Sequence, residues 1–369
     1  MERVSAEPDV EYHQGDESGP PVDFFSLVVP ANRLNPTFVN VRELEQYSAA
    51  REIIEPMMRW YEDVDGNFVE QFQTTGFDSR LWELYLFVAF SEMGFAIDRI
   101  HAVPDFTCVN PLTTFCVEAT TVNPTRDATG QIVPEPPMET PEQVDAYLRD
   151  YMPIKFGSAL TSKLAKKYWE RPQVSGKPLI LAVQDFSSPQ SMIATRSAFE
   201  NYVYGVAHDW DRDQDGKLTI HPRKIGTHRW GTKEIHSGFF DLPDSENVSA
   251  VLFSNSGTVA KFNRMGLLAG FGSPRLRLVR VGTAVDHNPN ATEPIAFRHV
   301  VNEAGYEETW CEGLDVWHNP NAKWPLTPDF LPGAAHHMLL PDGQIRSLTP
   351  EWHPFGSMTI QYLNGEASE

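Results

Sequence analysis

The most informative segment of the chain is residues 104–122, which read PDFTCVNPLTTFCVEATTV. Two short apolar runs flank Asn110–Thr113, a sequence typical of turns, and together they predict a β-hairpin with a four-residue loop. In that register Asp105 lies opposite Glu118. Directly opposed residues point to the same side of a sheet, with Cβ atoms about 4.5–5.5 Å apart. The hairpin therefore predicts a pair of neighbouring carboxylates.

Two carboxylates at this spacing repel each other unless a cation lies between them. A hard ion with oxygen ligands, Mg²⁺ or Mn²⁺, is the natural occupant. Thr120 lies two residues beyond Glu118 and shares its face of the strand. Glu83 precedes the hairpin in a segment of helical spacing, between apolar neighbours, and we expect it to point toward the sheet. An ion pair with Arg80, three residues earlier, is the alternative for Glu83.

The rest of the chain reads as alternating helices and strands. Helices are expected at Glu43–Val64, Asp78–Met93 (capped by Asp78 or Ser79 and ended by Gly94), Pro141–Tyr151 (capped by Thr140), Ile154–Trp169 and Ser187–Tyr204. Strands are expected at Phe95–Val103, Pro104–Val109, Thr114–Val122, Leu179–Phe186, Val248–Ser254, Leu276–Val285, Ile295–Val301, Glu312–Trp317, His337–Leu340 and Met358–Tyr362.

The order of these elements resembles the restriction-endonuclease-like, or PD-(D/E)XK, nuclease superfamily. The resemblance rests on a helix carrying Glu83, the step Pro104-Asp105, the strand with Glu118-Ala119-Thr120, a basic helix and an apolar strand. It covers residues 78–186. It implies an α/β core with a mixed sheet flanked by helices, followed here by a β-rich C-terminal region. It also implies a Mg²⁺ or Mn²⁺ ion held by Asp105 and Glu118, with Glu83 assisting.

This sequence departs from the family pattern at Thr120, where a lysine usually stands. The basic helix that follows offers Lys155 and Lys163 as replacements, with Lys166 and Lys167 as further candidates. The activity that the resemblance implies is metal-dependent cleavage of DNA. A homodimer would suit cleavage of both strands.

Composition limits how such a protein meets DNA. The 369 residues carry a net charge of −20, which repels nucleic acid at long range. Any contact with phosphates must therefore use local basic patches. The first patch consists of Lys155, Lys163, Lys166, Lys167, Arg171 and Lys177. The second consists of Lys261, Arg264, Arg275, Arg277 and Arg280.

Three regions are expected: a disordered acidic tail at residues 1–21, a nuclease-like core at 22–245, and a β-rich region at 246–369 that extends the same sheet or stands apart. The three cysteines are too few for a disulfide framework and suit a cytoplasmic protein. No apolar run approaches the roughly 20 residues of a membrane helix.

Other interpretations remain open. Without a working lysine the chain is a decayed nuclease fold that binds nucleic acid or assembles with partners. Paired acids and an acidic pI also fit a glycoside hydrolase, whose carboxyl groups work without a shared metal. Residues 211–216, DRDQDG, resemble the start of a calcium loop, but the position that should close the loop is Pro222, so an acidic hairpin turn is favoured.

Overall fold

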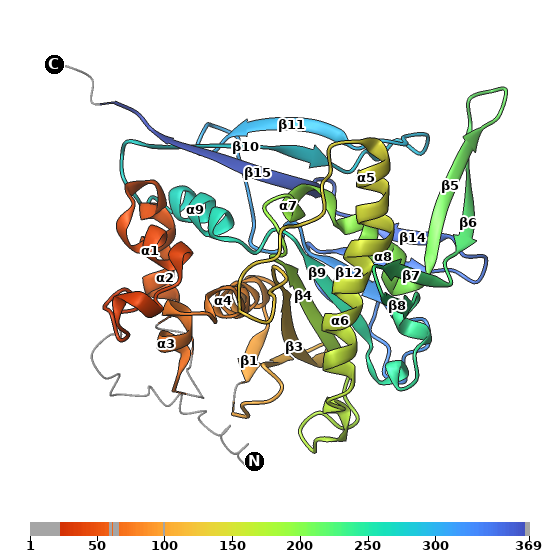
Figure 1. The fold of residues 1–369 in the computed structure, drawn as a ribbon, viewed down its shortest axis with the longest axis horizontal. Helices are drawn as coiled ribbons and strands as arrows, with labels where there is room; N and C mark the ends of the chain where they lie inside the picture. The colour runs from red at the N-terminus through yellow and green to blue at the C-terminus, as the bar shows by residue number, and fades with distance from the viewer. Residues whose placement is uncertain (1–22, 59–60, 62–65, 99, 366–369) are drawn as a thin grey trace, which may run out of the picture.

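The protein is described by a computed structural model that covers residues 23–58, 61, 66–98 and 100–365. The expected acidic tail, residues 1–21, lies outside the described residues. An eight-stranded mixed sheet runs through the centre of the molecule (Figure 1). Its strands, in spatial order, are β1 (Ala96–Asp98), β2 (Phe106–Val109), β3 (Thr114–Val122), β4 (Leu179–Asp185), β9 (Ala250–Ser254), β12 (Asp315–His318), β13 (Ala335–Leu339) and β14 (Ile345–Leu348).

Helices cover both faces of this sheet. The α-helices of the described chain are α1 (Pro36–Glu43), α2 (Ser48–Met57), α3 (Phe68–Gln73), α4 (Phe77–Glu92), α5 (Pro141–Ala146), α6 (Met152–Leu164), α7 (Ser191–Ala194), α8 (Arg196–Tyr204) and α9 (Val259–Leu268). None of the described helices is long and apolar enough to cross a membrane.

Alternate residues of the strands enter two separate cores. Phe115 and Val117 of β3 pack with α4, and α9 lies in the same core. Cys116 and Val122 of β3 pack with α6 and α8 on the opposite face. Every residue of β4 is buried, which is typical of a strand with parallel neighbours and helices on both faces.

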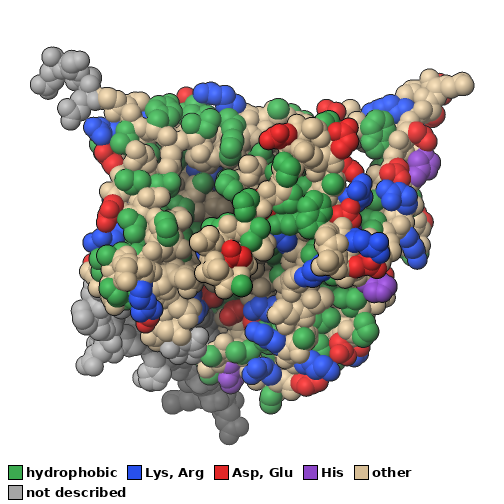
Figure 2. Space-filling view, in the orientation of Figure 1, with side chains coloured by type: hydrophobic (Ala, Val, Ile, Leu, Met, Phe, Trp, Pro, Cys, Tyr) green, Lys and Arg blue, Asp and Glu red, His purple; other side chains and the backbone are tan. Residues whose placement is uncertain are grey.

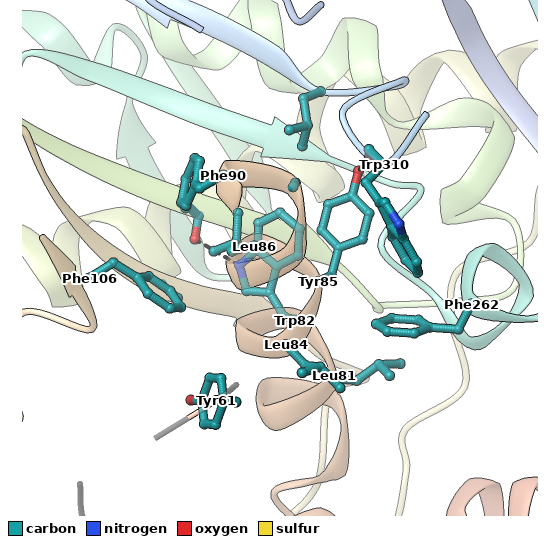
Figure 3. Packing of buried hydrophobic residues seen from close by; sticks show 14 of the residues in the cluster. Tyr61, Leu81, Trp82, Leu84, Tyr85, Leu86, Phe90, Phe106, Phe262 and Trp310 are labelled. Carbon is teal, nitrogen blue, oxygen red and sulfur yellow. Dashed lines mark hydrogen bonds between the residues drawn. The ribbon is translucent and has the colours of Figure 1, made fainter. Parts of the chain in front are cut away.

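The helix α4 is fixed against the sheet by large aromatic side chains. Trp82 stacks on Tyr85, with ring centroids 5.4 Å apart, and its indole N–H donates to the carbonyl of Ala182 in β4 (Figure 3). The Tyr85 hydroxyl donates to the carbonyl of Trp310, far away in the sequence. Because both sides of the indole are occupied, α4 has little freedom to rotate, and Glu83 is held in one direction.

A second sheet and two hairpins complete the described structure. The second sheet contains β11 (Ile295–Val300), β10 (Leu276–Ala284) and β15 (Pro354–Leu363) in that order. The hairpins are β5–β6 (Val206–Arg212 and Leu218–Lys224) and β7–β8 (Thr227–Trp230 and Lys233–His236), and β5–β6 projects from the body of the molecule (Figure 1).

The prediction of a mixed sheet flanked by helices, with a β-rich C-terminal part, is confirmed. Strands from both sides of the expected boundary near residue 245 belong to one sheet, because β9 pairs with β4. The first predicted helix is shorter, and α2 ends at Met57; residues 59–60 and 62–65 lie outside the described residues. The strand expected at Phe95–Val103 is reduced to β1. Asp78 and Ser79 lie inside α4 and do not cap it.

Several elements escaped the sequence prediction. The helix α9, the strand β14 and the β7–β8 hairpin were not expected, and no strand bounds were predicted for the hairpin turn at residues 211–216. The calcium-like segment lies at the end of the β5–β6 hairpin, where Asp213 Oδ1 accepts hydrogen bonds from the backbone of Asp215 and Lys217. These bonds form an acidic turn, which agrees with the favoured interpretation.

Candidate functional site

The candidate site lies just before β2 and beside the middle of β3. The strand expected at Pro104–Val109 begins only at Phe106, which pairs with Val117 as the predicted register requires. Asp105 therefore lies outside the ladder, and its carboxylate Oδ2 accepts a hydrogen bond from the backbone N–H of Ala119 at 2.7 Å. The Asp105 side chain thus accepts the hydrogen bond from β3 that the backbone of a neighbouring strand would otherwise accept. This bond anchors Asp105 to the strand that carries Glu118.

Glu118 is buried and only half satisfied. Its Oε1 accepts hydrogen bonds from Lys163 Nζ at 2.6 Å and from the Tyr168 hydroxyl at 2.7 Å. Its Oε2 is buried and accepts no hydrogen bond from the described residues. A buried carboxylate oxygen without a partner is costly, and it marks a position where a ligand is expected.

Glu83 is fixed by two neighbours. Its Oε2 accepts a hydrogen bond from the Tyr61 hydroxyl at 2.9 Å and from Arg80 Nη1 at 2.8 Å. The alternative expectation of an ion pair with Arg80 is therefore confirmed. The pair does not remove Glu83 from the site, because both Glu83 and Asp105 line the same pocket.

The raised pKa of Asp105 shows that negative charge exceeds positive charge at the candidate site. Burial, followed by the neighbouring charges of Glu118 and Glu83, raises the pKa of Asp105 to about 8, although Lys163 acts in the opposite direction. A carboxyl group with this pKa holds a proton at neutral pH. A cation bound there would take the place of that proton.

The structure brings most of the predicted site residues together. A pocket of about 210 Å³ is lined by Glu83, Asp105, Thr120 and Lys163, and Glu118 is bonded to Lys163. Thr120 lines this pocket, and the only lysine that lines it among the described residues is Lys163 of α6. Figure 2 shows Lys and Arg side chains beside acidic ones on this face, in the region of β3 and α6.

Lys155, the other predicted replacement, lies elsewhere. Its Nζ lies 3.1 Å from Glu135 Oε1 and 3.3 Å from Thr125 Oγ1. Eight residues along a helix correspond to about 12 Å of axial rise, so Lys155 and Lys163 of α6 reach different parts of the sheet. Lys166 and Lys167 are exposed, and Lys167 pairs with Asp244 at 3.3 Å.

Three of the five residues of the second basic patch are unavailable to phosphates, while Arg277 and Arg275, which pairs with Glu45, stay partly exposed. Lys261, Arg264 and Arg280 are buried and form ion pairs with Glu308; Arg280 also pairs with Glu312. The local sequence pattern did not indicate this burial, because the two acids lie about 30 to 50 positions further along the chain.

Tyr168 and Tyr61 were missed in the sequence. Tyr168 follows α6 in a short 3-10 helix (Tyr168–Glu170), and Tyr61 follows α2. The hydroxyl group of each donates a hydrogen bond to a carboxylate of the candidate site. The only available signal was an aromatic residue with a polar group next to a predicted helix end, which is common in many proteins.

The donor set suits a metal that keeps much of its water. Among the described residues, no group of three or more His, Cys, Asp or Glu side chains is arranged to hold a metal ion. Two carboxylates are available, Asp105 and the unpartnered oxygen of Glu118. Mg²⁺ is commonly bound by one or two carboxylates together with water and substrate phosphates, so the residues fit this ion.

Comparisons of the chain with models of protein families, with curated proteins and with solved structures find no match.

Proposed function

We propose that the protein is a metal-dependent phosphodiesterase that cleaves DNA. The observation that carries the proposal is the buried, unpartnered Oε2 of Glu118, next to Asp105 and on the same carboxyl group that Lys163 contacts at 2.6 Å. Two carboxylates can hold a metal ion that promotes phosphodiester hydrolysis, and a nearby lysine can offset charge on the phosphate.

The element order supports a restriction-endonuclease-like core. Along the chain, α4 carries Glu83, Asp105 directly precedes β2, and β3 carries Glu118. Then α6 carries Lys163, and β4 runs parallel to β3. This is the order on which the sequence resemblance rests. The lysine missing at Thr120 would in this proposal be supplied by α6.

Asp105 and the free oxygen of Glu118 would hold Mg²⁺ or Mn²⁺. Such an ion would supply Lewis-acid chemistry, which polarises a phosphate and lowers the pKa of a water molecule. Lys163 brings a positive charge to the same pocket, where it would offset charge that develops on the phosphate. Tyr168 fixes Glu118, and Arg80 with Tyr61 fixes Glu83, so the acids need little reorganisation on binding.

Cleavage of plasmid and single-stranded DNA with Mg²⁺ or Mn²⁺ tests the proposal. We expect Asp105→Asn and Glu118→Gln to lower the rate on the order of a hundredfold to a thousandfold, and EDTA to abolish it. Glu170→Gln removes an exposed acid just after α6 and is the matched control. Equal rates for all four proteins, with or without metal, would overturn the proposal.

Two rival functions make different predictions in the same assay. A decayed nuclease would bind DNA without cutting it and would show no dependence on Asp105. A glycoside hydrolase would cleave glycans in the presence of EDTA. The raised pKa of Asp105 suits a general acid of that second class, which is why the EDTA control is essential.

A further inference from the structure

A larger cavity lies beside the candidate site, at the ends of three parallel strands. It has a volume of about 610 Å³ and is bordered by Pro124 after β3, Asp185 at the end of β4 and Thr258 after β9. Figure 2 shows a hollow on this face near α9. Ligands of open α/β sheets characteristically bind outside the carboxyl ends of parallel strands.

Two polar side chains that line this cavity each have one buried atom without a hydrogen bond of ordinary geometry from the described residues. Asp185 is fully buried; its Oδ1 accepts a hydrogen bond from the backbone N–H of Ser187 at 2.8 Å, but its Oδ2 accepts none from the described residues. The Ser188 hydroxyl is buried and makes no hydrogen bond of ordinary geometry either, although the Tyr147 phenol lies close enough for Ser188 to act on its pKa. An acceptor left unsatisfied at the end of a strand is costly unless a ligand supplies a donor. Burial also raises the pKa of Asp185.

The side chains that line the cavity determine which kind of hydrogen-bond donor can bind there. Apolar side chains from three separate elements line it: Phe77 and Leu81 of α4, Met192 of α7, and Val133 of the loop after β3. Three acids, Asp78, Glu135 and Asp185, also line the cavity. Lys155 pairs with Glu135, and burial raises the pKa of Asp78 and Asp185, which disfavours their charged forms. A neutral, largely apolar group with an N–H donor fits these walls. Among the parts of a nucleic acid, a nucleobase with an amino group has this chemistry.

The cavity and the candidate site are both bordered by the helix α4 and by the central sheet. Asp78 of α4 lines the cavity, and Ser79, the next residue, lines the pocket of the acid pair. On the sheet, Asp185 pairs with Val122, while Thr120 lies two residues back on β3. Two residues along a strand span about 7 Å and adjacent strands are about 5 Å apart, so the two sites are close neighbours.

We propose that this cavity receives an unstacked nucleobase whose amino group donates a hydrogen bond to Asp185. As a subsite for a base of the cleaved strand, this inference rests on the proposed function; recognition of a nucleobase by itself does not. The Ser188 hydroxyl is a second hydrogen-bonding group for the same base.

Binding to the full chain in EDTA, where metal-dependent cleavage is suppressed, tests the inference. The probe is a single-stranded oligodeoxynucleotide with one adenine among thymines, compared with the same strand carrying purine, which lacks the amino group. We expect the wild type to prefer adenine about tenfold or more, and Asp185→Asn to lose the preference. Equal affinity for both strands in the wild type, or an undiminished preference in Asp185→Asn, would overturn the inference.

Two further arms complete the design. Ile132, 56% exposed, lines the cavity, so Ile132→Trp should block binding without disturbing the core, and an unchanged melting temperature would confirm folding. Adenosine and purine riboside, titrated separately, distinguish a free nucleoside from a base within a strand. Asp105→Asn is expected to lose cleavage but keep the adenine preference. Failure of the proposed function is therefore distinguishable from failure of this inference.

Discussion

Two buried ionic clusters of this protein differ in the balance of their charges. Around Glu308 and Glu312, three cations meet two carboxylates, and the cations hold the pKa of Glu308 well below its usual range despite burial. At the candidate site, Lys163 is the lysine that meets the acids, and the pKa of Asp105 rises to about 8. In the first cluster the positive charges of the chain outnumber the carboxylates, although Arg280 Nη2 makes no hydrogen bond with the described residues. The second lacks positive charge, and this deficit indicates a ligand site.

The largest difference between the two clusters is expected in how much each contributes to the free energy of unfolding. Glu308→Gln leaves Lys261 and Arg264 facing a neutral amide inside the protein, and we expect a loss of about 3–5 kcal/mol in the free energy of unfolding. The matched change at the candidate site, Glu118→Gln, should cost about 1 kcal/mol or less, because Lys163 is partly exposed and mutual repulsion of the acids is relieved. Urea denaturation of both variants measures the contrast. Similar losses would show that the two clusters are alike.

A second contrast lies within the first basic patch. Lys163→Gln should lower the cleavage rate on the order of a hundredfold, because it removes the positive charge next to the acid pair. Lys155→Gln changes the same residue type on the same helix, but its partner is Glu135. We expect its rate to stay within about threefold of the wild type. Rates measured at saturating Mg²⁺ separate this effect from metal affinity, and equal losses in both variants would argue against a special role for Lys163.

The two clusters should respond to pH in opposite directions. The folded pKa of Asp105 is raised, so its contribution to stability is complete below its usual value of 3.8 and is lost as the pH rises through about 8. The folded pKa of Glu308 is lowered, so its contribution is present above 4.5 and is lost as the pH falls through the lowered value. Unfolding free energies from pH 4 to 8, compared with Asp105→Asn, test the first statement. A wild type that gains stability over Asp105→Asn as the pH rises would contradict it.

The smallest expected effect concerns Tyr168. Tyr168→Phe removes the hydroxyl that donates to Glu118 but keeps the ring that packs in the core. We expect a loss of about 1 kcal/mol in stability and a few-fold change in the Mg²⁺ concentration for half-maximal cleavage. Tyr202→Phe, which alters another buried tyrosine away from the acids, serves as the control. An equal shift in Mg²⁺ dependence for both variants would remove Tyr168 from the site.

The sequence predicted what depends on local pattern. The bounds of β3 and the hairpin register follow from a turn and from neighbouring apolar residues, and both agree with the structure. The choice between Lys155 and Lys163 was not accessible, because it depends on where α6 begins and how it lies across the sheet. The same limit applies to Lys261, whose partner Glu308 is distant in the sequence. A run of basic residues in a sequence does not show which of them tertiary packing will bury.

The bond between Asp105 and the backbone of Ala119 makes the spacing of the acid pair a property of the hairpin. Rotation of the side chains alone cannot change this spacing, because Asp105 is hydrogen-bonded to the strand that carries Glu118. The loop Asn110–Thr113 should therefore tolerate changes of residue but not of length, because one inserted residue shifts every opposed pair. For anyone transplanting this site onto another scaffold, the length of the turn is the quantity to preserve.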